Sequence, residues 1–299
     1  MKKLLALILA LLLTCAFAFA AAEGGRYTCG DFVYVLLPNG TACITDYTGE
    51  AAELVIPAEL DGVPVTAIGA YAFSACRSLQ RVVVPEGVTS LGASAFCSCS
   101  GLQSVVLPES LTTIGNIAFS WCTALTEVNI PLAVTEVGAN PFYHCRLLVD
   151  MGVPEDHPLL EVVDGVLFDK VARRLVTYPE AREAAHYDVP AGTLTIGDGA
   201  FYKCTLTSVT IPEGVVTIGS EAFAECRGLT AVTLPEGVVT VGEKAFSSCR
   251  KLESLALPAS LTDIGTEAFT KGPKTLVVVG GSVAEAYCIA GELNYILAE

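Results

Sequence analysis

Residues 108–131 read P-E-S-L-T-T-I-G-N-I-A-F-S-W-C-T-A-L-T-E-V-N-I-P and form one copy of a unit that recurs along most of the chain. Its skeleton is L-x-x-V-x-L-P followed by V-T-x-I-G-x-x-A-F-x-x-C. The phenylalanine returns every 22 or 23 residues within two blocks, first at Phe73, Phe96, Phe119 and Phe142 and then at Phe201, Phe223, Phe246 and Phe269. A fixed period of this size is typical of a solenoid, whose coils pack only on their neighbours. The sequence therefore predicts a β-rich solenoid in which each coil has short strands and a helical turn.

Each part of the unit has an expected place in a coil. Leu102, Val105 and Leu107 have the L-x-x-L-x-L spacing of a short strand whose alternate residues face inward. Pro108 ends this strand because it has no N–H to donate. The A-F-x-x-C segment fits one turn of helix that places Phe and Cys in the core. The glycine of the unit, such as Gly92, is expected to adopt a backbone angle that other residues avoid.

The composition fits a folded protein with an acidic surface. Hydrophobic residues make up 52% of the 299 residues, too many for a disordered chain and enough for a continuous core. Acidic residues outnumber basic ones by 32 to 17, which gives a formal net charge of −15. Nucleic-acid binding needs a basic footprint, and an anionic membrane surface would repel this charge. We therefore expect neither nucleic acid nor an anionic membrane as a partner.

Residues 1–22 have the pattern of a secretory signal peptide. A basic start precedes the apolar run from Leu4 to Leu13, and small residues with A-x-A spacing follow it. A lipoprotein signal with acylation at Cys15 is the alternative, although Thr14 stands where such signals have Gly, Ala or Ser. Because no second apolar run of about 20 residues appears, no transmembrane segment is expected after signal removal. These features predict an exported protein, either secreted or held at the cell surface.

Most of the twelve cysteines share one position of the unit, three residues after the phenylalanine. The seven at this position are Cys76, Cys99, Cys122, Cys145, Cys204, Cys226 and Cys249. Equivalent residues in stacked coils lie ~4.7–4.9 Å apart with parallel side chains, whereas a disulfide needs Cβ atoms ~3.8 Å apart. We therefore expect buried thiols that act as small apolar core residues. Cys97, beside Phe96, is expected to be the most exposed thiol.

The repeat pattern also divides the chain into segments. After the signal (1–22), these are an N-terminal β-hairpin cap (23–53), repeat block 1 (54–154), a β-meander insert (155–187), repeat block 2 (188–273) and a C-terminal cap (274–299). Asn39-Gly40 and Asp164-Gly165 mark hairpin turns in the first cap and in the insert. The insert is expected either to protrude from the solenoid or to be spliced into it. In the C-terminal cap, Ser282 is expected to start a helix that Gly291 ends, and a closing strand is expected near Tyr295.

The unit resembles the BspA-type leucine-rich repeat of bacteria, whose members carry x-L-P-x-x-[VL]-T-x-I-G-x-x-A-F-x-x-C-x-x-L. The resemblance covers about residues 28–297. It includes the D-G-V-L-F-D-K stretch of the insert (Asp164 to Lys170) and the G-S-V-A-E-A-Y stretch of the C-terminal cap (Gly281 to Tyr287). It implies a leucine-rich-repeat array in an exported or surface-attached protein. Family members are implicated in adhesion, including binding to host matrix proteins and to other bacteria, so the resemblance implies a protein partner of that kind.

No catalytic, cofactor-binding or metal site is expected. The three histidines, His144, His157 and His186, lie outside zinc-binding patterns such as H-E-x-x-H, and no G-x-S-x-G is present. The column glycines are spaced one per coil, so they form no phosphate-binding cluster. His157 is expected in a surface loop that opens the insert. An enzyme with a site in the insert, built on His157 or Asp164, is the alternative.

The outward positions of the main strands are the remaining candidates for recognition. The candidate partner-binding residues are Arg81, Val83, Ser104, Val106, Glu127, Asn129, Ser208, Thr210, Thr233 and Ser254. These side chains are small and mostly uncharged, on what would be a flat, extended sheet face. A merely solvated sheet is one interpretation, since Thr and Val are ordinary strand residues. A recognition face is the other, because solenoids offer extended binding surfaces.

Two hypotheses for the function follow. In the first, the chain is an exported, non-enzymatic and monomeric protein that binds an extracellular or cell-surface protein. In the second, it is a structural scaffold module of the cell envelope without a selective ligand.

Overall fold

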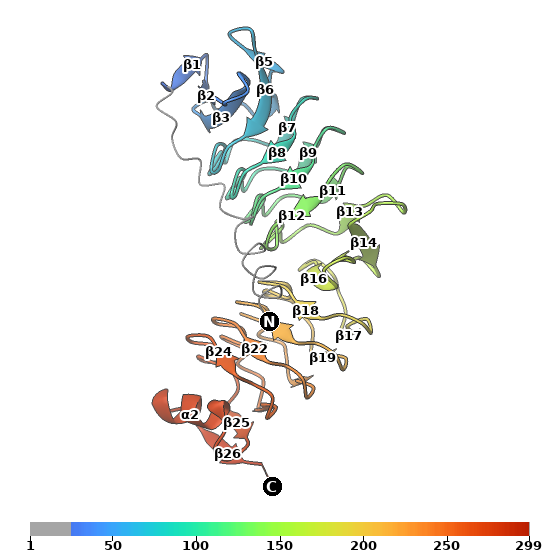
Figure 1. The fold of residues 1–299 in the computed structure, drawn as a ribbon, viewed down its shortest axis with the longest axis vertical. Helices are drawn as coiled ribbons and strands as arrows, with labels where there is room; N and C mark the ends of the chain where they lie inside the picture. Colours follow the sequence, from blue (N-terminus) through green and yellow to red (C-terminus); the bar gives the residue numbers. More distant parts are fainter. Residues whose placement is uncertain (1–24, 299) are drawn as a thin grey trace, which may run out of the picture.

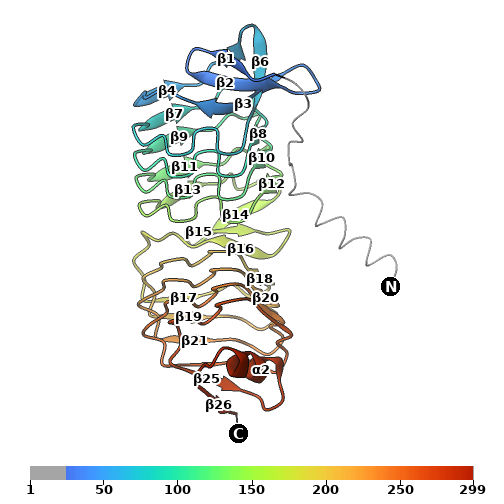
Figure 2. The ribbon, with the colours of Figure 1, turned by 90° about the vertical axis from the view of Figure 1, so that its left-hand side faces the viewer.

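The structure, a computed structural model, describes residues 25–298, which form an elongated solenoid (Figure 1). The repeating coils contribute a front strand, just before the proline of the unit, and a back strand, just before its glycine. The front strands are β4 (Glu53–Val55), β7 (Arg81–Val83), β9 (Ser104–Val106), β11 (Glu127–Asn129), β13 (Asp150–Gly152), β17 (His186–Asp188), β19 (Ser208–Thr210), β21 (Ala231–Thr233) and β23 (Ser254–Ala256). The back strands are β6 (Val63–Ile68), β8 (Ser90–Leu91), β10 (Thr113–Ile114), β12 (Glu136–Val137), β16 (Arg174–Thr177), β18 (Thr195–Ile196), β20 (Thr217–Ile218), β22 (Thr240–Val241) and β24 (Asp263–Ile264). Figure 2 shows the two rows along opposite sides of the molecule, so the predicted β-rich solenoid is confirmed.

The A-F-x-x-C segment forms the turn that leads from a back strand to the next front strand. Cys97 N–H donates to Ser94 O at 3.0 Å, and Cys99 N–H donates to Phe96 O at 3.3 Å. These i→i+3 bonds make the turn tighter than an α-helix. Phe96 N–H also donates to Ala118 O of the next coil at 2.8 Å, so adjacent turns are hydrogen-bonded to one another. Phe96 and Cys99 point inward and are fully buried, as their spacing predicted.

The expectation for the glycine column is wrong. None of the eight glycines at this position has a positive φ. They are needed instead because adjacent coils meet there backbone to backbone: a Cβ on Gly115 would lie 2.6 Å from the carbonyl carbon of Gly92. Left-handed backbone occurs at non-glycine residues of the turn, including Ser94 (φ 57°) and Ser98 (φ 61°).

Stacked phenylalanine rings run through the core. The ring centroids of Phe73 and Phe96 are 4.9 Å apart, and the spacing along the first block widens to 5.8 Å at its end. Tyrosines continue the column: Tyr47 packs on Phe73 at 5.2 Å, and Tyr178 packs on Phe201, where the second run of phenylalanines begins, at 5.2 Å. Each fully buried ring contributes roughly 1.5–3 kcal/mol through removal of apolar surface from water.

Six of the seven column cysteines are buried as expected, and Cys76 is half-buried. Several of them also donate hydrogen bonds. The Cys122 thiol donates to Phe96 O at 3.1 Å, and the Cys145 thiol donates to Phe119 O at 3.1 Å. The same bond is made by Cys99, Cys226 and Cys249, so in these five coils the thiol is joined to the coil before it. All eleven cysteines in the described part of the chain are free thiols. Cys97 is half-buried, as are Cys29 and Cys76.

The N-terminal hairpin forms where Asn39-Gly40 predicted it. Strands β2 (Phe32–Leu36) and β3 (Ala42–Tyr47) are antiparallel, and β1 (Tyr27–Cys29) pairs with β2. Gly40 has φ +81°, the left-handed conformation that the turn requires. Strand β3 then pairs in parallel with β6, so the hairpin covers the first edge of the back sheet. A short strand, β5 (Glu59–Leu60), pairs with the first residues of β6 in the antiparallel direction.

The insert is part of the solenoid and lies between the two repeat blocks. Strands β14 (Leu160–Val163), β15 (Val166–Asp169) and β16 form an antiparallel meander, and β16 pairs in parallel with β18. Every residue of β15 is buried, and its side chains alternate between two hydrophobic clusters. Leu167 belongs to the cluster of the first repeats, whereas Val166 and Phe168 belong to that of the second. The described core is therefore divided at this sheet.

At the C-terminal end, helix α2 (Val283–Ala290) covers the last coil. The Ser282 side chain accepts a hydrogen bond from Glu285 N at 3.2 Å, which confirms the expected N-cap. The ring of Tyr287 meets that of Phe269 edge-on at 5.8 Å and so ends the aromatic column. Strand β25 (Thr275–Val278) pairs with β23, and β26 (Tyr295–Leu297) pairs with β25. None of the helices in residues 25–298 has the length and apolar character needed to cross a bilayer. The predicted signal, residues 1–22, lies outside the described residues.

Candidate functional site

The ten candidate residues lie on the outer face of the front strands, which we call the front face. Of these residues, Val83, Ser104 and Ser208 are half-buried, and the others are exposed. Neighbouring strands place their outward residues side by side, so Arg81 lies beside Ser104 and Thr210 beside Thr233. The central residues of the strands, such as Val105, point into the core. The side chains thus form columns across adjacent strands, and their role in binding stays a prediction.

The front face is not one continuous hydrogen-bonded sheet. Strands β4, β7, β9, β11 and β13 form one hydrogen-bonded sheet, β17, β19 and β21 a second, and β23, β25 and β26 a third. The break between β13 and β17 coincides with the insert. Sequence reasoning also missed outward residues next to this break, namely Asp150 on β13 and His186 and Asp188 on β17. Val189-Pro190 after β17 carries the L-P ending of the unit and could have revealed this strand.

A hydrogen-bonded trio lies on the front face beside the break. Ser208 Oγ is 2.7 Å from His186 Nδ1, and His186 Nε2 is 2.9 Å from Asp188 Oδ1. Hydrogen bonds from Thr210 and His186 lower the pKa of the Asp188 carboxyl. Acyl transfer would also need N–H donors for a developing oxyanion, but Ser208 N–H already donates to Ala185 O at 3.1 Å. The trio is therefore a polar feature of the surface, and we assign it no catalytic role.

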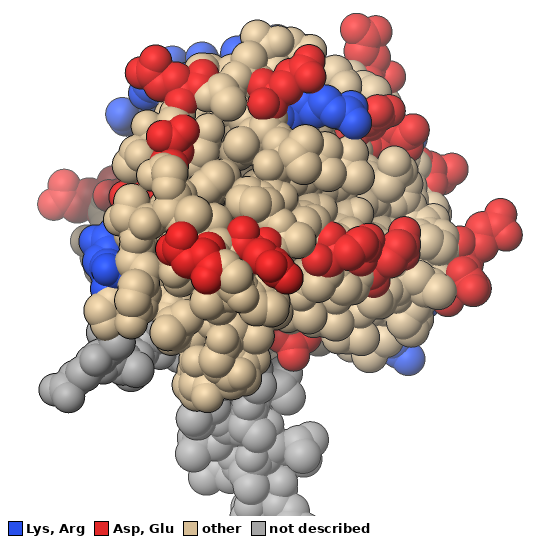
Figure 3. All heavy atoms as spheres, turned by 90° about the horizontal axis from the view of Figure 1, so that it is seen from above, with Lys and Arg blue, Asp and Glu red and all other residues tan. Residues whose placement is uncertain are grey.

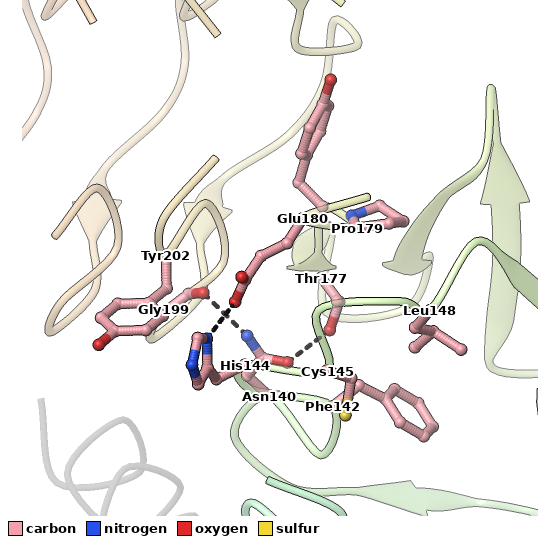
Figure 4. Close-up of a pocket in the computed structure, with 11 residues that line it drawn as sticks. Asn140, Phe142, His144, Cys145, Leu148, Thr177, Pro179, Glu180, Gly199 and Tyr202 are labelled. Carbon is pink, nitrogen blue, oxygen red and sulfur yellow. Dashed lines mark hydrogen bonds and ion pairs between the residues drawn. The ribbon is translucent and has the colours of Figure 1, made fainter. Parts of the chain in front are cut away.

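A second polar cluster joins the two repeat blocks behind the insert, around a cavity of about 10 Å³ (Figure 4). The Asn140 side chain connects three coils: its Oδ1 accepts from Thr177 Oγ1 at 2.6 Å and its Nδ2 donates to Gly199 O at 2.8 Å. A cavity of this size holds about one water molecule. The cluster is therefore too small to be a substrate pocket.

A buried hydrogen bond between His144 and Glu180 lies next to this cavity. His144 Nδ1 is 2.8 Å from Glu180 Oε1, and Lys203 Nζ is 3.4 Å from His144 Nε2. Burial raises the pKa of the Glu180 carboxyl, although its hydrogen bond to His144 acts in the opposite direction. Tyr143 stacks on Tyr202 at 4.3 Å in the same region. These contacts join segments 36 to 59 residues apart in the sequence, which gives the cluster a clear structural role.

The expectation that His157 lies in a surface loop is wrong. Its side chain is fully buried. Nδ1 accepts from the backbone N–H groups of Leu159 and Leu160 at 3.1 and 3.0 Å, so Nε2 carries the proton and donates to Pro131 O at 3.2 Å. Burial lowers the pKa of His157, which keeps the ring neutral. Both ring nitrogens are occupied, so His157 holds the loop in place and offers no free base for catalysis.

The acidic column next to the prolines also has a structural role. Glu86 accepts hydrogen bonds from the backbone N–H groups of Glu109 and Ser110 in the next coil, at 3.0 and 3.3 Å. Glu236 makes the same kind of contact to Ala259 N at 3.3 Å.

Seen from the end that carries the N-terminal hairpin, acidic side chains dominate the charged surface (Figure 3). Among residues 25–298, no group of three His, Cys, Asp or Glu side chains is placed to hold a metal ion.

These features define the class of the protein. It is a leucine-rich-repeat solenoid with a segmented front face and short columns of mixed side chains. The N-terminal hairpin caps one end of the solenoid, and helix α2 caps the other. A family model described as the BspA type leucine rich repeat region matches residues 50–161 and 189–279, in six copies. The chain therefore belongs to the BspA-type leucine-rich-repeat family, and the resemblance seen in the sequence is confirmed.

Solved structures agree with this assignment. A leucine-rich cell surface protein from Faecalibacterium prausnitzii A2-165 is 26% identical, with a TM-score of 0.56 over 90% of this chain and 98% of that one. The pneumococcal vaccine antigen PcpA is 20% identical, with a TM-score of 0.58 over 85% of this chain and 82% of that one, a likeness in fold alone. No curated protein matches the sequence at a significant level.

Proposed function

We propose that the chain is an exported, non-enzymatic protein that binds an extracellular or cell-surface protein through its front face. The observation that carries this proposal is the arrangement of exposed side chains in columns along the outer side of successive strands. A protein partner can contact several coils at once on such a face, so many small contacts add to one interface. The family assignment and the similarity to a cell surface protein support the proposal that the chain is exported.

The alternative is a structural scaffold of the cell envelope. Thr and Val are common on any exposed strand, and a face of this kind is stable without a ligand. The interruption after β13 favours recognition, because His186 and Asp188 expose hydrogen-bonding groups on β17, the first strand after the break. Such groups supply specificity to an otherwise uniform surface.

The test compares a front-face variant with a matched control. Val106 on the front face is 41% exposed, and Val216, beside a back strand, is 43% exposed. The chain is first screened against matrix proteins, intact cells and glycans, and bound partners are then measured with Val106→Lys and Val216→Lys. Recognition by the front face predicts that Val106→Lys weakens binding about tenfold or more while Val216→Lys leaves it unchanged. Equal behaviour of the two variants, or no partner in the screen, would favour the scaffold.

A further inference from the structure

A groove at the C-terminal end of the solenoid gathers basic side chains in an otherwise acidic protein. It has a volume of about 590 Å³ and lies between the last regular coil and the segment that precedes β26. Arg250, Lys271 and Lys274 line it, together with one acidic residue, Glu292, the half-buried Leu293 and the buried side chains of Phe269 and Leu276. Its size is within the ~300–1,000 Å³ of typical ligand pockets.

Two of these cations have no acidic partner. Lys274 Nζ is paired with Glu253 Oε1 at 2.5 Å. Arg250 and Lys271, in contrast, have no carboxylate within 4.0 Å among the described residues. The arginine one coil earlier, Arg227, does pair with a neighbouring glutamate, Glu225, at 2.5 Å. Arg250 thus occupies the position of Arg227 without its partner, and it lines a groove instead.

The charge of the whole molecule limits what can bind there. With 32 acidic residues against 17 basic ones, the chain repels a long polyanion once that polymer extends beyond the groove. A single anionic group escapes this repulsion. The planar Arg250 guanidinium suits a carboxylate, which can accept two parallel hydrogen bonds from it, and the apolar side chains suit a hydrophobic group beside that carboxylate.

We propose that this groove binds the C-terminal end of a peptide, with the terminal carboxylate at Arg250 and Lys271, on the side away from Glu292, and an apolar last side chain against Leu293. The site is distinct from the front face, and neither proposal depends on the other. It would let one molecule engage a protein partner on the front face and a chain end at the C-terminal end.

The experiment is an NMR titration of the isotope-labelled chain with N-acetyl-Ala-Ala-Phe as the free acid and as the C-terminal amide. Saturable shifts at residues around the groove are expected with the acid, and binding about tenfold weaker or undetectable with the amide, because a charge-assisted hydrogen bond is lost. Arg250→Gln and Lys271→Gln should each lower the affinity for the acid. Arg227→Gln, the matched change one coil earlier, should leave it unchanged. These exposed side chains can be replaced without loss of folding, which the spectrum itself verifies.

Other outcomes overturn the proposal. Equal binding of acid and amide would show that the carboxylate is not recognised, and an equal loss in Arg227→Gln would show a general charge effect. Stronger binding of glucuronic acid or of polyphosphate than of the peptide acid would assign the groove to a sugar acid or a polyanion. The absence of groove shifts with the peptide acid at millimolar concentration would remove the site altogether.

Discussion

The thiol of Cys122 donates a hydrogen bond to the carbonyl oxygen of Phe96, one coil earlier in the solenoid, over 3.1 Å. The same bond recurs from Cys99 to Phe73 and from Cys249 to Phe223, each at 3.0 Å. It explains why the column holds cysteine, which combines a small apolar volume with a weak donor. In the last coil Gly272 takes this position, and a Cβ there would meet Phe246 O at 2.3 Å.

Loss of one thiol donor should destabilise the solenoid measurably. Cys122→Ala removes both the hydrogen bond and the buried sulfur, so we expect a loss of ~1–3 kcal/mol in the free energy of unfolding, measured by urea denaturation. Cys97→Ala is the control, because Cys97 is half-buried and its sulfur hydrogen-bonds to the hydroxyls of Ser98 and Ser120 and not to a backbone carbonyl of the preceding coil. We expect a change within ~0.5 kcal/mol there. Equal losses in the two variants would contradict a specific role for the column thiol.

The glycine column should tolerate no side chain. In Gly115→Ala the new Cβ would lie 2.6 Å from the backbone of Gly92, so adjacent coils must separate. We expect a loss of ~1–3 kcal/mol, seen as a lower thermal midpoint. Gly280→Ala is the matched control, since its Cβ would have only Leu297 Cδ2 as a neighbour, at 3.9 Å. A midpoint for Gly115→Ala that equals that of the control would refute the close-contact explanation.

The two faces of β15 should affect different halves of the molecule. Leu167 packs with the first repeats and Phe168 with the second. We therefore expect Leu167→Ala to increase amide hydrogen exchange mainly in 54–154 and Phe168→Ala mainly in 188–273, each at a cost of ~2–5 kcal/mol. Mass spectrometry of exchanged peptides measures this division. Uniform loss of protection in both variants would mean that the two blocks unfold as one unit.

The buried thiols should make the fold sensitive to alkali. Burial raises the pKa of Cys249 to about 12 and that of Cys43 to about 11, whereas an unfolded thiol ionises near ~8.5. A raised native pKa means that this stability is fully present below the unfolded pKa and is lost as pH rises toward the native value. Above pH ~8.5 each such thiol should lower the free energy of unfolding by ~1.4 kcal/mol per pH unit.

Urea midpoints between pH 7 and 10.5 check this expectation. The urea midpoint should fall less steeply with rising pH in Cys249→Ala than in the parent chain, because one thiol whose ionisation opposes folding has been removed. The same slope in both proteins would show that ionisation of other groups causes the decline.

Several features could be read from the sequence because they depend on local pattern. The 22–23-residue period placed the strands, the inward Phe96 and Cys99 and the turn at Asn39-Gly40, since each coil repeats the same local geometry. The cap at Ser282 followed from its side chain and the helix after it. The ten front-face residues were placed on outward positions by alternation alone, but alternation says nothing of what binds there.

Other features depended on which segments meet in space. His157 was expected at the surface because polar residues in loops usually are; its burial follows from backbone groups at Pro131, Leu159 and Leu160 that need a partner. The glycine column was attributed to backbone conformation, whereas the cause is contact with the next coil. Neither contact can be predicted from the local sequence pattern, because each one joins different coils.

The sequence by itself determined the solenoid, its period and its inward residues, because each coil obtains its core from neighbours with the same spacing. Only the tertiary structure decided how the two blocks join. There β15 is buried on both faces, Tyr143 stacks on Tyr202 across 59 residues of sequence, and the front sheet breaks between β13 and β17. The interval of 36 residues between Pro154 and Pro190 departs from the 22- or 23-residue repeat, so the partners of this segment are set by the packing of both blocks against one inserted sheet. Packing of this kind depends on shape and on unpaired backbone groups, which periodicity does not encode.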